Sequence, residues 1–475
     1  MKTTYNRRFL VAAVVISAFV TMLNQTILSV AQPKLMTAFS LSTATVQWLS
    51  TGYALVSGVL IPITAWLADR YNTKHLFVTT ELIFLFGTII ASFAPSFGWL
   101  LLGRFVQAMG AGILSGLAMT ILFSVYPKDE RSTPTALLGI VFGLAPAVGP
   151  TLGGWLVDTW GWHSIFIAML PVIILAVLMG LFFMADVVPH RVIPLDWPSV
   201  IYSMSGFGLL LFGFSNVGNH GWGAASTIAP IICGSIITAL FLFRQGRIKN
   251  PILQLRVFGQ GNFALAAIIS AIAQISMVAV EFILPLYLQN VRNLTAFQSG
   301  LTLLPGAIVM FLMSPLAGKL LGAGKGRTIV IFGVLVMTLS TLALTFITLT
   351  TPIWLVILAY AIRNVGLSFV MMPASTLGMQ SLPRDLISHG SSSNNMVRQI
   401  GAAIGTAILV SIMSNVATTT SPSTKLLQTD RQAFTTGIHQ ALVNGAHAAL
   451  WAATAIGALG VILSLFLKSD QQLNQ

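Results

Sequence analysis

Long apolar stretches, interrupted at short intervals by charged residues, glycine or proline, follow one another through almost the whole chain. Fourteen of them are about 20 residues long, the length that an α-helix needs to cross a membrane. They lie near residues 9–31, 46–67, 76–96, 100–124, 135–157, 163–185, 197–216, 224–243, 263–288, 299–321, 328–349, 353–375, 396–416 and 447–467. The pattern predicts an all-α polytopic membrane protein with fourteen transmembrane helices and both termini on one side.

Composition supports this interpretation. Of the 475 residues, 56% are hydrophobic and 7% are charged, against about 25% charged in an average globular chain. A soluble enzyme and a disordered chain are therefore excluded. The apolar run after the basic start is too long for a cleaved signal peptide, so we expect it to be retained as the first span. The single cysteine, Cys233, provides neither a disulfide nor a cysteine metal site, and we expect no cofactor.

The net charge of +13 is informative through the positions of the Lys and Arg residues along the chain. With a cytoplasmic N-terminus, eighteen Lys and Arg residues fall inside and four fall outside: Lys34, Arg292, Lys425 and Arg431. This is the positive-inside distribution of membrane proteins. Because the basic residues are scattered over many short loops, nucleic acid is not an expected partner.

Two connections are longer than the rest. The outer loop 417–446 opens with a Ser/Thr-rich run and is expected to be a flexible cap or a hairpin. The basic loop 244–262 has apolar residues between polar ones, which predicts an amphipathic segment on the inner membrane surface.

The turn WLADRYNTK (66–74) follows the second span. Asp69, Arg70 and Lys74 can pair with helix ends and latch neighbouring helices together. The alternative is an ordinary basic inner loop. A related loop at 318–327 in the second half suggests an internal repeat, as in many transporters.

Two further motifs lie in the fourth and fifth spans. Arg104 and Gln107 lie on nearly the same helical face, and a buried arginine normally faces a cavity or a partner; snorkelling to the outer interface is the alternative. The fifth span carries GLAPAVGPTLGG, whose small residues permit close helix approach and whose prolines permit bending. Its candidate residues are Gly149, Pro150, Gly153 and Gly154.

These segments together resemble the major facilitator superfamily. ADRYNTK looks like its inner-loop motif, RFVQAMGAG is similar to its fourth-span motif, and APAVGPTLGG resembles the fifth-span motif of its drug/proton antiporters. LPLYLQNV, SGLTLLPGAI, NPILQLRVF and RQIGAAIGTA resemble the fourteen-span branch. WLSTGYALVSGVLIPITAWL resembles its lincomycin-resistance-type exporters; quaternary-ammonium-type multidrug exporters belong to the same branch.

The resemblance implies a six-helix bundle over 1–190, two linking helices and a cytoplasmic loop over 191–254, and a second six-helix bundle over 255–475. It implies a substrate site between the bundles, with access alternating as they rock. It assigns Asp69 and Arg70 to a conformational latch and Arg104 to proton coupling. It assigns the fifth-span glycines to the bending face that favours antiport.

One departure from the family pattern matters for proton coupling. Asn24 and Gln25 stand in the first span where many relatives have a carboxylate, and an amide cannot exchange a proton. Only two carboxylates lie well inside spans, Glu81 and Glu281. Glu281 is nearer the expected central cavity, and a buried carboxyl group can carry a proton near neutral pH. It is therefore the leading candidate for coupling. The alternative is a structural pair with Arg363.

A drug pocket would need adaptable apolar and aromatic side chains. The candidates for contact with substrate are Asn24, Gln25, Gln107, Arg363, Phe282, Tyr287 and Met310. Apolar members of this set are also typical of helix packing.

The sequence thus predicts a monomeric, proton-driven exporter of hydrophobic, cationic or amphipathic drugs in the bacterial cytoplasmic membrane, surrounded by lipid. The nearest alternative is an exporter of an endogenous metabolite. A membrane-embedded enzyme would need clustered Asp and His residues or a metal site, and an ATP-driven pump would need a GxxxxGK[ST] segment; the sequence has neither.

Overall fold

A computed structural model describes residues 6–126, 132–188, 196–248, 251–383 and 386–468. These residues form helices and connections, and no β-strand occurs among them. The elements are α1 (Arg7–Thr26), η1 (Ser29–Ala31), α2 (Gln32–Phe39), α3 (Thr43–Val46), α4 (Trp48–Arg70), α5 (Thr73–Ser92), α6 (Phe97–Val125), α7 (Ser132–Trp160), α8 (His163–Phe183), α9 (Trp197–His220), α10 (Ala225–Gln245), η3 (Leu255–Gly259), α11 (Gly261–Leu286), η4 (Tyr287–Val291), α12 (Ala296–Gly322), α13 (Gly326–Leu344), α14 (Ile353–Gln380), α15 (Ile387–Thr419), α16 (Thr424–Thr429) and α17 (Arg431–Leu465).

Most of the long helices can cross a membrane. Within the described residues, twelve helical segments are long and apolar enough to do so, which confirms an integral membrane protein. The helices α4 and α7, with 23 and 29 residues, are long enough, but some of their side chains are not described, and they are not among the twelve. The predicted total of fourteen therefore stays a prediction for these two helices.

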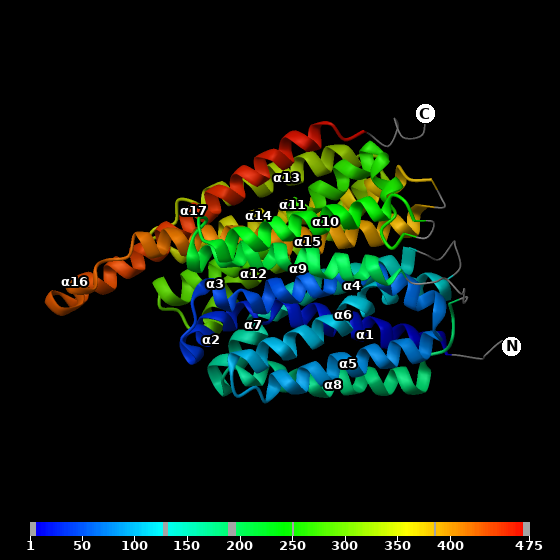
Figure 1. The fold of residues 1–475 in the computed structure, drawn as a ribbon, viewed down its shortest axis with the longest axis horizontal. Coiled ribbons are helices and arrows are strands. Elements are labelled where there is room, and N and C mark those ends of the chain that lie inside the picture. The colour runs from blue at the N-terminus through cyan, green and yellow to red at the C-terminus, as the bar shows by residue number, and fades with distance from the viewer. Residues whose placement is uncertain (1–5, 127–131, 189–195, 249–250, 384–385, 469–475) are drawn as a thin grey trace.

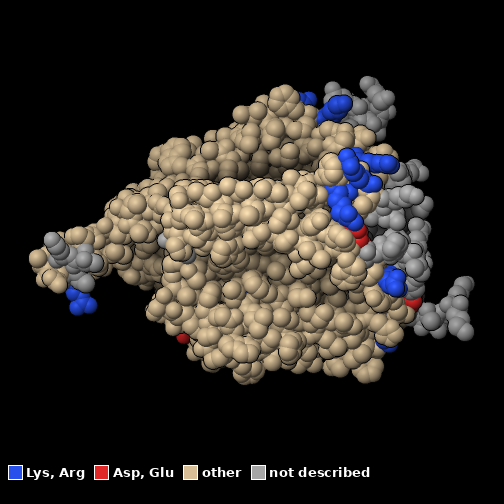
Figure 2. Space-filling model, viewed as in Figure 1, with Lys and Arg blue, Asp and Glu red and all other residues tan. Residues whose placement is uncertain are grey.

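The bundle has two chemically different ends. The first residues of α1 and the last residues of α17 lie at the same end (Figure 1). Lys and Arg side chains gather at this end, which we call the basic end. The lateral face between the two ends is almost free of charge (Figure 2). The other, distal end carries α2, α3, the first turn of α12 and α16.

Two long contacts join the helices of the first half (α1 and α4–α8, the N-terminal set) to those of the second half (α11–α15 and α17, the C-terminal set). Helix α7 packs along α12, and α4 packs along α15. An apolar core contains residues of both sets, including Leu28, Leu100, Leu284 and Leu344. Helices α9 and α10 pack against each other, and α9 also contacts α4 and α15.

An ion pair closes the α9–α10 hairpin at the basic end. Asp196 caps α9 by accepting from the Ser199 backbone N–H, at 3.2 Å. Its carboxylate also accepts from Arg244 Nε at 2.7 Å and Nη2 at 2.5 Å. The hydrogen bonds from Arg244, and then those from Ser199, lower the pKa of Asp196 from 3.8 to about 2.

This lowered pKa predicts a pH effect on stability. The pair contributes stability that is fully present above pH 3.8 and is lost as the pH falls towards 2. Asp196→Asn should lower the melting temperature in detergent at neutral pH. The effect should be small, because the Arg244 side chain is 37% exposed. The gap between parent and variant should close on acidification; a gap that stays constant down to pH 2 would contradict this assignment.

Two sequence expectations need correction, and for a third the structure favours one of the two alternatives. The first span does not continue as one α-helix to residue 31: α1 ends at Thr26, and the chain continues through η1 and α2. The apolar residues of loop 244–262 pack against the protein, with Leu253 and Val257 buried. Segment 417–446 fits the hairpin alternative rather than the flexible cap: the end of α15, α16 and the start of α17 form a mostly helical arm that projects from the distal end (Figure 1).

Candidate functional site

Arg104 is the centre of a polar cluster in the N-terminal set. Its side chain is 1% exposed, about 10 Å along α6 from Phe97, so it does not snorkel to the interface. Nε donates to the Leu49 carbonyl oxygen at 3.2 Å, and Nη1 donates to Asn24 Oδ1 and, at 3.0 Å, to Gln107 Oε1. The guanidinium charge is thereby surrounded by oxygen acceptors.

The cluster extends on both sides of Arg104. Gln107 Nε2 donates to Thr88 Oγ1 on α5 at 2.8 Å. The guanidinium carbon lies 4.2 Å from the centroid of the Tyr53 ring, a cation–π distance, and Gln25 lies beside the Tyr53 hydroxyl. The structure thus brings Asn24, Gln25, Arg104 and Gln107 together. Helical spacing indicated the proximity of Arg104 and Gln107 alone. The cluster holds a fixed positive charge and no carboxylate.

A second polar cluster lies in the C-terminal set, between α11 and α14. Arg363 is fully buried, and its Nη2 donates to Ser276 Oγ at 3.0 Å. Its Nε and Nη1 are buried without a hydrogen-bond partner. Glu281 lies close enough to Arg363 and Tyr360 to interact electrostatically with both. No ion pair between Glu281 and Arg363 is present among the described residues, so the structural pair is not formed in this conformation.

Glu281 lies deeper in its helix than its sequence context suggested. Helix α11 continues through η4 to Val291, which places Glu281 about 15 Å from that end instead of about 10 Å. The Glu281 side chain is half-buried. A carboxyl group at this depth can exchange a proton only when water reaches it.

Glu81 occupies a different environment. It lies on α5, is 1% exposed and is next to Ser17 of α1. Its Oε1 atom is buried without a hydrogen-bond partner. Glu81 therefore lies within the packing of the N-terminal set, in the environment of a contact between α5 and α1.

The predicted apolar substrate contacts are packed inside the protein. Phe282, Tyr287 and Met310 are 2%, 3% and 7% exposed. The Tyr287 hydroxyl donates to the Thr348 carbonyl oxygen at 2.7 Å. In this conformation these three side chains stabilise helix contacts; their contact with substrate stays a prediction.

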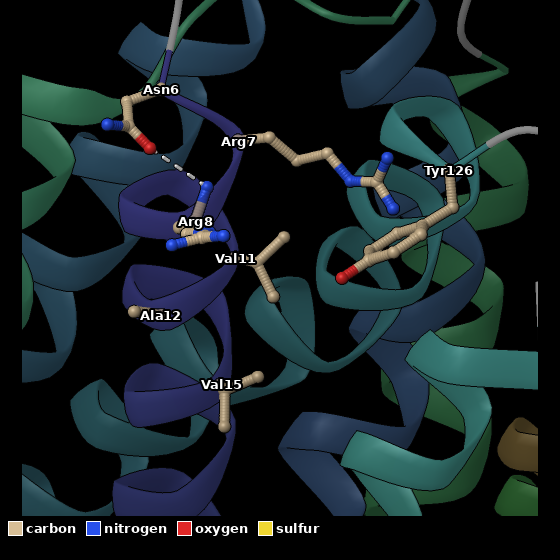
Figure 3. A pocket seen from close by; sticks show the side chains of 7 residues that line it. All are labelled: Asn6, Arg7, Arg8, Val11, Ala12, Val15 and Tyr126. Carbon is tan, nitrogen blue, oxygen red and sulfur yellow. Dashed lines mark hydrogen bonds between the residues drawn. The ribbon is translucent and has the colours of Figure 1, made fainter. Parts of the chain in front are cut away.

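Among the described residues, pockets open to the outside include two that bear on the site prediction. One, of about 930 Å³, lies at the basic end and is lined by Asn6, Arg7, Arg8, Val11, Ala12, Val15 and Tyr126. Figure 3 shows Arg7 extending from α1 towards the Tyr126 ring, with the guanidinium carbon 3.8 Å from the ring centroid. The other, of about 580 Å³, lies between the distal parts of α13 and α14. Neither pocket contains a predicted site residue.

The predicted latch is only partly described. The side chain of Asp69 lies outside the described residues. Arg70 is exposed, with its guanidinium carbon 5.7 Å from the Trp66 ring centroid, and Lys74 is half-buried. A contact that the sequence did not indicate lies beside them: Asp186 Oδ1 accepts from the Thr73 backbone N–H and from Thr73 Oγ1, both at 3.0 Å. Asp186 therefore ties the segment after α8 to the start of α5.

The fifth-span motif mediates two close helix contacts. A Cβ atom at Gly153 would lie 2.7 Å from the Ile27 side chain, and one at Gly149 would meet the Thr26 hydroxyl. On the other side, a Cβ atom at Gly154 would lie 2.7 Å from the backbone of Phe297 in α12, and Pro150 lies against Gly300. The motif thus holds α7 against the end of α1 and against the C-terminal set.

Arg398 is a candidate that the sequence analysis missed. The thirteenth span was predicted to begin at 396, which left Arg398 at the inner boundary. Helix α15 begins at Ile387, so Arg398 is its twelfth residue and lies within a membrane-spanning helix. Its Nη2 donates to Asn395 Oδ1 at 2.9 Å, and its Nε is buried without a partner. The first residues of this helix, SHGSSSNN, are polar, so the sequence pattern placed the start of the span too late.

Comparison with known proteins places this geometry in context. The family model of the Major Facilitator Superfamily matches residues 14–406. An uncharacterized MFS-type transporter, YcnB of Bacillus subtilis, is 39% identical over 98% of this chain and 96% of that protein. The lincomycin resistance protein LmrB of Bacillus subtilis is 35% identical over 96% and 95%. The riboflavin transporter RibZ of Clostridioides difficile is 26% identical over 97% of each chain.

The fold also has solved counterparts. The crystal structure of a bacterial homolog to the human lysosomal transporter Spinster covers 98% of this chain and 97% of its own, with a TM-score of 0.66 and 18% identity. At this identity the match shows a shared fold.

Proposed function

Because the chain belongs to the Major Facilitator Superfamily, we propose that it is a secondary active exporter that uses the proton gradient to expel amphipathic drugs, including cationic ones. Membership of this family identifies a transporter rather than an enzyme. The lincomycin resistance relative confirms the resemblance to drug exporters and supports a drug as the substrate. The riboflavin relative supports the second candidate, an exporter of a metabolite.

The observation that carries proton coupling is Glu281 beside Arg363. An ionised carboxylate deep in a membrane is costly unless it is paired, and no ion pair between the two residues is present in the described part of the chain. Glu281 is therefore suited to hold a proton in this conformation. Loss of the proton would make pairing with the open donors of Arg363 favourable. Glu281 and Arg363 thus have two arrangements, one for each protonation state.

Arg104 has a different role in this proposal. Its donors are engaged by Asn24, Gln107 and Leu49, so it provides a fixed charge and a rigid contact between α1, α4 and α6. Asp69, Arg70 and Lys74 would latch the basic end, and Glu81 is a second candidate for a proton. Asn24, Gln25 and Gln107 would offer hydrogen bonds to substrate.

The arrangement in the membrane follows from the charges. We place the basic end in the bacterial cytoplasm, because a positive-inside distribution favours it. Helices α4 and α7 complete fourteen spans. Residues 1–190 and 255–475 form the two moving bundles, α9 and α10 within 191–254 link them, and the protein works as a monomer among lipids.

The test is uptake of ethidium into energised everted vesicles that contain the protein. We expect uptake that stops when nigericin collapses the pH gradient, with empty-vector vesicles as the control. Uptake that persists without the pH gradient would reject proton antiport. Riboflavin uptake by the same vesicles, without ethidium uptake, would favour the metabolite exporter.

A further inference from the structure

Among the described residues, four hydrogen bonds join the first half of the chain (residues 6–188) to the second half (residues 251–468), and all four lie towards the distal end. Gln289 Nε2 donates to the Val30 carbonyl oxygen at 2.8 Å, and Thr151 Oγ1 donates to the Gly300 carbonyl oxygen at 3.3 Å. The other two reach Asp158, near the end of α7. This residue was not a candidate from the sequence.

Asp158 binds the first turn of α12. Its Oδ2 accepts from the Phe297 backbone N–H at 2.7 Å, and its Oδ1 accepts from the Ala296 backbone N–H at 3.3 Å. The first N–H groups of a helix have no partner within the helix and carry partial positive charge. A carboxylate from another helix is thus bound by both hydrogen bonds and charge.

The start of α12 leaves these two donors available. Thr295 and Gln298 form a capping box: Thr295 Oγ1 accepts from the Gln298 N–H, and Gln298 Oε1 accepts from the Thr295 N–H. The box provides acceptors for the backbone N–H groups of Thr295 and Gln298, and it leaves the two N–H groups between them without an acceptor. Those two belong to Ala296 and Phe297, and Asp158 takes both.

The contact lies where α7 and α12 pack closely. Gly154 faces the backbone of Ala296 and Phe297, and Gly300 faces Pro150 and Thr151, so no side chain separates α7 from α12. Asp158 is exposed. Water can therefore replace both of its hydrogen bonds when the helices part, and separation does not leave a buried charge behind.

We propose that Asp158 is a reversible cap on α12 that holds the distal end closed and is released each time that end opens. At the basic end, no hydrogen bond between the two sets occurs among the residues that the structure describes. The conformation is therefore one closed at the distal end. This inference does not depend on what the protein transports.

The test measures access to a reporter cysteine between α7 and α12. In a Cys233→Ser background, Thr151→Cys replaces a half-buried residue at this contact. A membrane-impermeant maleimide is added to right-side-out and to everted vesicles. Asp158→Ala should label about three- to tenfold faster than the parent from the side that carries the distal end, because two charge-assisted hydrogen bonds are lost from the closed state.

A matched variant controls for loss of a helix cap. Asp430 accepts from the Ala433 N–H at 2.9 Å and caps α17 within the helical arm at the same end of the protein. Asp430→Ala should leave the labelling rate unchanged. Equal acceleration in both variants would mean general loosening and would overturn the proposal.

Asp158→Asn keeps the size of the side chain and retains one acceptor oxygen, and it should label at an intermediate rate. It provides the test if Asp158→Ala does not fold. A parental rate in the folded variant would overturn the proposal. Because labelling needs no substrate, such a failure is distinct from failure of the proposed drug export.

Discussion

Glu281→Gln is expected to reduce gradient-driven ethidium uptake to the level of vesicles without the protein. Glutamine keeps the size and hydrogen-bonding capacity of the side chain but cannot release or take up a proton. The folded protein should remain, because the carboxyl group makes no ion pair with Arg363 among the described residues. Uptake into everted vesicles at equal protein level measures the effect, and parental uptake would reject Glu281 as the coupling group.

Glu81→Gln is the matched control, because it neutralises the other membrane-embedded carboxyl group in the same way. We expect it to retain gradient-driven uptake, since Glu81 is enclosed in the N-terminal set at 1% exposure. Loss of uptake in Glu81→Gln alone would move the coupling role to α5.

If Glu281 instead forms a structural pair with Arg363 in another conformation, Arg363→Ala should lower the yield of folded protein, because it removes one partner of a buried charge pair.

Gly154→Val is expected to disrupt the α7–α12 contact and to abolish transport. Added side-chain atoms would have to enter the space held by the backbone of Ala296 and Phe297. Overpacking of this kind costs about 1–3 kcal/mol, and here the backbone cannot rotate away as a side chain could. The two sets would be forced apart at the distal end. The melting temperature in detergent and ethidium uptake measure the two effects.

Gly208→Val provides the comparison for this substitution. Gly208 lies in α9, and a Cβ atom there would meet nothing within 4 Å. The same change of residue type should therefore leave both stability and uptake near the parental values. Parental behaviour of Gly154→Val would show that α7 and α12 can separate at no cost, which would contradict the packing described above.

Much of the helical framework could be predicted because lipid imposes a simple rule on the sequence. Backbone polar groups in a bilayer must be satisfied within the segment, so apolar length alone predicts most spans. The rule fails where a helix carries many polar residues. The start of α15, with Ser391, Asn394 and Asn395, looked like a loop, and Arg398 was consequently placed at its edge.

The candidate site was predictable to the extent that it is local. Arg104 and Gln107 are three residues apart on one helix, so their proximity follows from helical geometry, and each is polar enough to need a partner in a membrane. The contact of Asp158 with Ala296 joins residues 138 positions apart. No local spacing indicates it, because it depends on how the two sets pack. The same holds for Asp186 and Thr73.

The helical arm at the distal end has a mechanical consequence. It joins α15, which packs along α4, to α17, which packs along α13. The 35 residues of α17 extend about 50 Å, well beyond a hydrocarbon core of about 30 Å. Any tilt of these helices is therefore magnified at the tip of the arm near α16. A fluorophore attached near α16 would lie in the aqueous phase, away from the lipid. Its displacement would report the tilt of α15 and α17 in each turnover.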